Sequence, residues 1–177
     1  MEINKMLGVR ESFQAPSALM KILKNKTARD ELINQYRNEH PDLSVDHFRE
    51  YFMESQSDRK GDKQDYTPDS IGDIIAGIIG PRKRVLDIAG GIGGLTIHQW
   101  AGHHDGEFVV EEISSASLPF LLLNLLVRKI NATVIHGDSL ERVAKDVYTI
   151  SDDDLSIEPH TPELLAKFGL RGWTNEL

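Results

Sequence analysis

Cysteine is absent from the 177 residues of the chain. Disulfide bonds, thiolate metal sites and a cysteine nucleophile are therefore excluded, which is typical of cytoplasmic proteins. Apolar runs long enough to cross a bilayer are also missing, and residues 1–8 lack the long apolar core of a signal peptide. We therefore expect a soluble, cytoplasmic protein that makes no membrane contact.

A basic excess is missing as well. The chain has 28 acidic and 20 basic residues, which gives a formal net charge of -8. Proteins that bind nucleic acid mainly through phosphates normally carry a basic excess, so any DNA contact here must depend on local patches. Three basic clusters could supply them: Lys21, Lys24, Lys26 and Arg29; Arg59, Lys60 and Lys63; and Arg82, Lys83 and Arg84.

Regular metal-ligand and nucleophile motifs are not present either. His98, His103 and His104 have no spacing typical of a metal site, so we assign them to a surface loop and expect no metal. Ser114, Ser115 and Ser117 have no base in a recognisable nucleophile motif. Helix capping accounts for these serines.

The length suits one domain with a real core and an N-terminal helical extension. Apolar residues recur at helical spacing around positions 18–23, 32–36 and 48–52, which predicts three short amphipathic helices. A strongly polar link follows at 55–65. We therefore divide the chain into an N-terminal helical region, residues 1–60, and an α/β domain, residues 61–177.

The segment Val85–Leu95, Val-Leu-Asp-Ile-Ala-Gly-Gly-Ile-Gly-Gly-Leu, predicts a strand, a tight turn and a helix. Glycines allow positive φ and leave room for a ligand, while the opening helix presents unpaired N–H groups. Such a turn suits a nucleotide-like ligand, although G-G-x-G-G differs from the dinucleotide fingerprint. Upstream, Thr67 and Pro68 predict the start of another helix, as N-cap and first residue.

Strands and helices alternate after the glycine turn. We predict strands over 108–113, 132–136 and 146–150, a helix over 118–127 and a short helix over 162–168. This alternation indicates an α/β fold with a parallel, doubly wound sheet. The segment Leu118–Val127 is apolar almost all round, so we expect it to be buried by the N-terminal helices or by another subunit.

Acidic residues fall at the carboxyl ends of three successive strands: Asp87, Glu111 or Glu112, and Asp138. Ligands of a doubly wound sheet bind beyond these ends, so the three acids predict one site. A carboxylate about 20 residues after a glycine turn is placed to bind ribose hydroxyls, and Glu112 fits. The alternative is that Glu112 and Asp138 are ordinary loop acids.

Four short motifs occur in order: Asp65-Tyr-Thr-Pro, the glycine segment Val85–Leu95, Glu112-Ile-Ser and His136-Gly-Asp-Ser-Leu. Together they resemble the N6-adenine DNA methyltransferases, particularly the modification subunit of type I restriction systems. Residues 118–138 also look like small methylase proteins of phages and mobile elements. The resemblance implies an incomplete Rossmann-like methyltransferase fold over residues 61–177, with S-adenosyl-L-methionine as cofactor.

The same resemblance implies roles for individual residues. Tyr66, Thr67 and Pro68 would line the methionine end of the cofactor, and the glycine turn would surround its carboxylate and sulfonium. Glu112 would hold the ribose, and Asp138 would hydrogen-bond the adenine amino group. The residues expected to bind the cofactor are thus Tyr66, Thr67, Pro68, Asp87, Ala89, Gly90, Gly91, Gly93, Glu112 and Asp138.

The catalytic motif of this family, Asn-Pro-Pro followed by an aromatic residue, is missing. In the family its carbonyl groups hydrogen-bond the target amine, and its ring stacks on the flipped base. None of the seven prolines here is adjacent to another, and Ser151-Asp-Asp-Asp stands where the motif is expected. The catalytic residues therefore remain unassigned.

Two functions stay open. One is a compact DNA adenine-N6 methyltransferase, completed by a partner that supplies the missing motif or target recognition. The other is a non-catalytic relative that binds restriction–modification or other host proteins, as a phage anti-defence or regulatory factor does. In either case we expect a protein partner or a second copy to bind Leu118–Val127. A small-molecule methyltransferase is a third alternative, although Tyr66-Thr-Pro favours the DNA family.

Overall fold

The computed structural model describes residues 3–55, 66–158, 166 and 174–175. Its helices are α1 (Ile3–Met6), the 3-10 turn η1 (Ser12–Gln14), α2 (Ala15–Lys24), α3 (Lys26–Glu39), α4 (Arg49–Ser55), α5 (Asp69–Ile79), α6 (Gly94–Gly102) and α7 (Leu118–Val127). Its strands are β1 (Arg84–Ile88), β2 (Glu107–Glu112), β3 (Ala132–Asp138), β4 (Val143–Ser151), β5 (Asp154–Glu158) and β6 (Thr174–Asn175). None of the described helices is long and apolar enough to cross a membrane. Residues 56–65, with their basic cluster, and nearly all of the helix predicted over 162–168 lie outside the described residues.

The strands form one sheet in the order β1-β2-β3-β4-β5, with β6 beside β4. β1, β2 and β3 are parallel, and Val110 of β2 lies between Asp87 of β1 and Val134 of β3. β4 runs antiparallel to β3, and β5 antiparallel to β4. The α/β class is confirmed, but the prediction of a wholly parallel sheet is wrong. The connection from Asp138 to Val143 is too short for a parallel return, which needs about a dozen residues.

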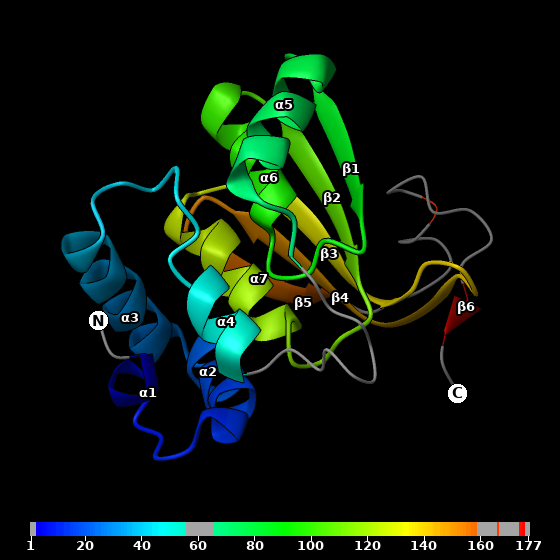
Figure 1. Ribbon diagram of the computed structural model, residues 1–177. Helices are drawn as coiled ribbons and strands as arrows, with labels where there is room; N and C mark the ends of the chain where they lie inside the picture. The colour runs from blue at the N-terminus through cyan, green and yellow to red at the C-terminus, as the bar shows by residue number, and fades with distance from the viewer. Residues whose placement is uncertain (1–2, 56–65, 159–165, 167–173, 176–177) are drawn as a thin grey trace.

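Helices cover one face of the sheet over the described residues (Figure 1). α6 connects β1 to β2 and α7 connects β2 to β3, so the two crossovers advance in the same direction. Right-handed crossovers that advance the same way place their helices on the same face. The doubly wound arrangement predicted from the sequence is therefore not present in the described part of the chain.

Helix α7 lies at the centre of the core, and each of its residues from Leu118 to Val127 is buried. It is enclosed by α2, α3 and the sheet. Phe120 of α7 meets the rings of Phe48 and Phe52 edge-on, with centroids 5.5 and 5.4 Å apart. Of the two covers predicted for this helix, the structure has the N-terminal helices. Within this chain α7 presents no exposed face to a partner or second copy, and the expectation of a protein partner stays a prediction.

The N-terminal helices are held to the sheet by one continuous hydrophobic core. In α2, Ala15, Leu19 and Leu23 recur every fourth residue and are fully buried against α7. Burial of a leucine side chain stabilises a fold by about 1.5–3 kcal/mol, so this stripe attaches α2 firmly. The three amphipathic helices predicted in this region are confirmed as α2, α3 and α4.

Candidate functional site

The glycine turn joins β1 to α6. Gly91 and Gly93 have φ values of 60° and 96°, in the left-handed region that glycine adopts most easily, and Ala89 also has a φ of 60°. The Gly93 N–H donates to the Gly90 carbonyl at 2.8 Å, which closes the turn just before α6. A Cβ at Gly91 would meet the Tyr66 ring at 3.0 Å. The predicted strand, turn and helix are confirmed, and the turn leaves no room for a side chain at Gly91.

Asp87 precedes this turn near the end of β1. The Thr96 hydroxyl in α6 donates to Asp87 Oδ2 at 2.6 Å, so the carboxylate is fixed between strand and helix. Burial raises the pKa of Asp87 above its ordinary value, while hydrogen bonds from Thr96 act in the opposite direction. A partly desolvated carboxylate attracts a cation more strongly than an exposed one does.

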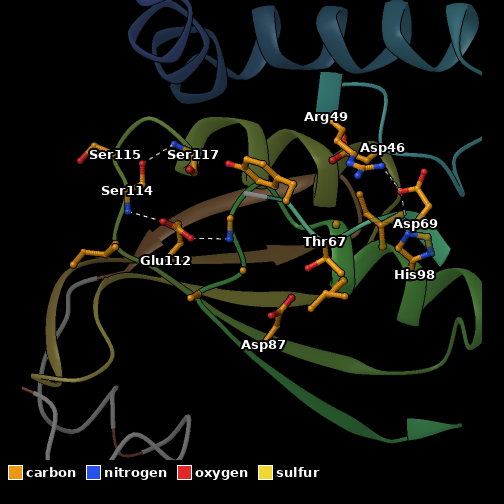
Figure 2. Close-up of a pocket in the computed structure, with 18 residues that line it drawn as sticks. Asp46, Arg49, Thr67, Asp69, Asp87, His98, Glu112, Ser114, Ser115 and Ser117 are labelled. Atoms are coloured by element: carbon orange, nitrogen blue, oxygen red, sulfur yellow. Dashed lines mark hydrogen bonds and ion pairs between the residues drawn. The ribbon is translucent and has the colours of Figure 1, made fainter. Parts of the chain in front are cut away.

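Glu112 ends β2 and connects the glycine turn to the next loop (Figure 2). Its Oε2 accepts the Gly91 N–H at 2.7 Å, and its Oε1 accepts the Ser114 N–H at 2.6 Å. Burial raises the pKa of Glu112, and these backbone donors oppose that shift because they stabilise the carboxylate. The neighbouring Glu111, the alternative candidate, is also buried, but the alternation of a strand turns it to the other face of the sheet. Glu112 is therefore the site residue of the pair.

A cavity of about 700 Å³ opens beyond the carboxyl ends of β1 and β2. Its size and place are typical of ligand sites in α/β proteins. Its lining contains the acidic residues Asp46, Asp69, Asp87 and Glu112 and the basic residues Arg49 and His98. The four acids outnumber the basic groups, so the cavity favours a ligand that carries positive charge.

An ion-pair cluster joins three helices at this cavity (Figure 2). Arg49 Nη1 of α4 lies 3.1 Å from Asp69 Oδ1 of α5. His98 of α6 places Nδ1 2.8 Å from Asp73 Oδ1 and Nε2 3.5 Å from Asp69 Oδ1. The assignment of His98 to a surface loop is wrong, because it lies inside α6 and its ring packs against Gly72 of α5. Among the described residues, no cluster of three or more His, Cys, Asp or Glu side chains could hold a metal ion.

Most of the residues predicted to bind the cofactor come together here. Tyr66, Thr67, Asp87, Ala89, Gly90, Gly91 and Glu112 line the cavity. Pro68 instead precedes α5 as its N-cap residue, one position later than the predicted cap. Gly93 packs against α7, where a Cβ would meet Leu121 Cδ1 at 3.0 Å. These two residues are not among those that line the cavity.

Asp138 is used by the turn that follows β3. Its Oδ1 accepts the N–H groups of Leu140 and Glu141 at 2.8 and 3.0 Å. This carboxylate caps the connection to β4 and is not among the residues that line the cavity. The cavity lining thus contains Asp87 and Glu112 but not Asp138, and a role of Asp138 in cofactor binding stays a prediction.

A buried polar network behind the glycine turn could not be assigned from sequence. Asn124 of α7 donates to the Ile92 carbonyl at 2.8 Å and to Asp46 Oδ1 at 3.0 Å. Arg128 donates to Asn124 Oδ1 at 2.9 Å and to the Leu43 carbonyl at 2.6 Å. The available sequence signal for this network was Asn124 itself, a single amide side chain in an otherwise apolar helix. The network ties the loop before α4 to the glycine turn.

A base does lie beside one of the serines assigned to capping. Ser115 Oγ is 3.2 Å from His136 Nε2, and Ser115 lines the cavity. His136 Nδ1 is 3.5 Å from Asp146 Oδ2, which exceeds an ordinary hydrogen-bond length. The buried Nδ1 atom therefore has no hydrogen-bond partner in the structure. The contact corrects the interpretation that these serines have only a capping role. The side chains of Ser115, His136 and Asp146 nevertheless lack the close base–carboxylate contact of a nucleophilic triad.

Comparison with known proteins supplies the family. The family model described as N-6 DNA Methylase matches residues 41–155, which is 115 of the 177 residues. No curated protein and no solved structure matches the chain. The match spans α4 to the start of β5 and contains the glycine turn, Asp87 and Glu112. The chain therefore belongs to the N-6 DNA methylase family.

Proposed function

We propose that the protein binds S-adenosylmethionine in the cavity at the end of β1. The observation that carries this proposal is the pair of carboxylates beside the glycine turn, the half-buried Asp87 and the buried Glu112. The cofactor has a cationic sulfonium and a ribose diol. A carboxylate attracts the first and accepts hydrogen bonds from the second.

The residues present fit such a ligand. Each Glu112 oxygen accepts one backbone N–H and keeps a further acceptor position, so it can also receive a ribose hydroxyl. The tight approach of Tyr66 to Gly91 brings an aromatic wall against the turn. A cavity of about 700 Å³ is adequate for a ligand of this size. When bound, the cofactor would supply the methyl group.

Family membership supports adenine in DNA as the methyl acceptor, and the turn after β4 supports dependence on a partner. This turn stands where the catalytic motif is expected, and it joins β4 to β5. Its Asp153 lies 2.7 Å from Arg37 Nη2 and 2.9 Å from Lys129 Nζ. The turn contains no aromatic ring to stack on a base. We therefore propose that a second polypeptide supplies the catalytic motif.

The acidic turn also favours a second candidate function. A non-catalytic family member would keep the cofactor cavity and use it to sense the cofactor while it binds restriction–modification or other host proteins. Such a protein needs no aromatic residue after β4. The two candidates differ in whether methyl transfer appears when partner proteins are added.

The first test is calorimetric titration of the whole chain with S-adenosylmethionine, with Asp87→Asn and Asp138→Asn as a matched pair. We expect Asp87→Asn to weaken binding at least about tenfold, since it removes a charge inside the cavity. Asp138→Asn changes the same chemistry outside the cavity and should bind like the wild type. Equal binding by all three proteins would place the cofactor elsewhere.

The second test uses cofactor with a tritiated methyl group and unmethylated DNA. We expect no transfer by the chain alone. Transfer by the isolated chain would overturn partner dependence and leave cofactor binding intact. Transfer only after addition of host proteins would distinguish the partner-dependent enzyme from the non-catalytic relative.

A further inference from the structure

Among the described residues, strand β1 is an open edge of the sheet. In the part of the chain that the structure describes, it pairs with β2 alone. The Glu107 N–H donates to the Lys83 carbonyl at 3.0 Å, which sets the alternation of the parallel ladder. Every second residue of a parallel strand bonds to each side, so the backbone groups of Leu86 and Ile88 point away from β2. They are available to another strand.

The side chains of β1 are those of a central strand. Parallel strands are usually covered on both faces and are rich in Val, Ile and Leu, and β1 has Val85, Leu86 and Ile88 around Asp87. Leu86 and Ile88 are nevertheless 54% and 58% exposed. Val109, which lies beside Leu86 on the same face of β2, is only 5% exposed. Of the two paired strands, β1 thus has exposed apolar side chains, whereas those of β2 are buried.

A second apolar surface borders the same edge. Ile71, Ile74 and Ile78 occupy one stripe of α5 and are 43%, 56% and 78% exposed. α5 packs along α6, while α7 lies on the far side over β3, so α5 is on the β1 side of the helical layer (Figure 1). This surface thus combines the exposed apolar stripe of α5 with the outward backbone N–H and C=O groups of β1.

We propose that an extended segment of another polypeptide adds to β1 as a new edge strand and packs beneath the isoleucine stripe of α5. Strand addition of this kind uses main-chain hydrogen bonds for affinity and alternate side chains for specificity. Arg82 and Lys83 lie immediately before β1 and are exposed. The segment is therefore apolar at alternate positions and acidic at the end beside these two residues.

A second copy of this chain does not meet that description. Two β1 strands related by a twofold axis would run antiparallel. With Leu86 on the axis, Arg82 and Lys83 would face Gly90 and Ala89 of the other copy, which carry no acid. The charge pattern thus assigns the edge to a different chain.

Pairing at this edge reaches the cavity. β1 runs directly into the glycine turn, so residues at the other end of the added segment would line the cavity on the side that this chain leaves open. Ligands of open α/β sheets bind between two strands whose connections diverge, and among the described strands β1 has a neighbour on one side. This step rests on the proposed function. It predicts that the segment and the cofactor strengthen each other's binding by the same factor.

The test selects a displayed library of random peptides, about a dozen residues long, on the whole chain without cofactor. We expect alternating apolar peptides with acidic ends that protect the Leu86 and Ile88 amides from hydrogen exchange. Leu86→Lys and Ile74→Lys should each weaken the selected peptides at least about tenfold. Leu140→Lys, at a leucine that is 93% exposed and remote from this edge, is the matched control.

Thermal unfolding of each variant checks that the fold is retained. Selected peptides that bind Leu86→Lys and the wild type equally, or a library that yields no binder, would overturn the proposal. A wild-type dimer that Leu86→Lys dissociates would assign the edge to a second copy and overturn it too. Because the peptides are tested without cofactor, a failure of cofactor binding leaves this result readable.

Discussion

The two edges of the sheet differ in what their side chains contact. At the β5 edge, Asp154 lies 2.9 Å from Arg29 Nη2 of α3, and Glu158 accepts a hydrogen bond from Thr149 at 3.0 Å. At the β1 edge, Leu86 and Ile88 are 54% and 58% exposed, while β5 has one exposed large apolar residue, Ile157, at 48%. Each edge strand has a single neighbour among the described strands. Proteins protect an edge strand from pairing with other chains by placing charged side chains on it or by covering it with a helix or loop. One edge of this sheet is protected and the other retains the composition of a strand that is to be covered.

The same contrast separates ligand binding from support. The open edge ends in the glycine turn and the cavity, whereas the β5 edge is anchored to the N-terminal helices. Substitutions near β1 should therefore change binding, and substitutions near β5 should change stability. Three predictions test this division, in order of decreasing effect.

The largest effect is expected from Gly91→Val. A valine would need φ near 60°, and its Cβ would meet the Tyr66 ring at 3.0 Å. Calorimetry should show at least about a hundredfold loss of S-adenosylmethionine affinity, since the turn must move. Gly77→Val is the control, because a Cβ there has nothing within 4 Å and φ is not positive. Unchanged affinity in Gly91→Val would show that the turn is not a binding element.

An intermediate effect is expected from Arg29→Met at the protected edge. Arg29 is 4% exposed and donates to the Leu23 carbonyl at 3.2 Å as well as to Asp154. Urea unfolding should show a loss of about 1–3 kcal/mol in the free energy of unfolding, with cofactor affinity unchanged. Lys26→Met, which removes an exposed pair with Asp30, should cost less than about 0.5 kcal/mol. Equal losses in the two variants would contradict the anchoring role of Arg29.

The smallest effect is expected from pH. Burial raises the pKa of both Asp87 and Glu112, so these groups take up protons at a higher pH than exposed carboxylates, whose pKa is about 4. A cationic ligand binds the ionised form, so its affinity falls as pH drops through the raised pKa. S-adenosylhomocysteine has no sulfonium charge and is the control. The affinity ratio of the two ligands should fall several-fold as the pH is lowered from neutral into the range where these carboxyl groups take up protons, and parallel profiles would contradict a carboxylate–sulfonium contact.

Local pattern predicted the elements that position the site. The apolar run gave α7 with the bounds Leu118–Val127, and the glycine spacing gave the strand, turn and helix around Gly91. Both features depend on residues that are neighbours in sequence. The antiparallel course of β4 could have been read from the short connection after Asp138, and the predicted strand began too late to show it.

The features of the site that the sequence did not predict depend on contacts between residues far apart in the chain. Asp46 enters the cavity wall because Asn124, far along the chain, donates to it, and neither residue has a local motif. Asp138 occupies the expected motif but is used by its own turn. A carboxylate at a strand end can bind a ligand or a backbone N–H equally well, and only the fold distinguishes the two.

The burial of α7 has a practical consequence for dissecting this protein. The family match begins at residue 41, after α2 and α3 have ended, yet these two helices cover the most apolar element of the chain. A fragment trimmed to the matched segment would expose that element to water and leave a large apolar surface that favours aggregation. The segment that matches the family and the segment that folds as a unit therefore have different boundaries. Expression of the methylase segment requires the first forty residues, because they cover α7.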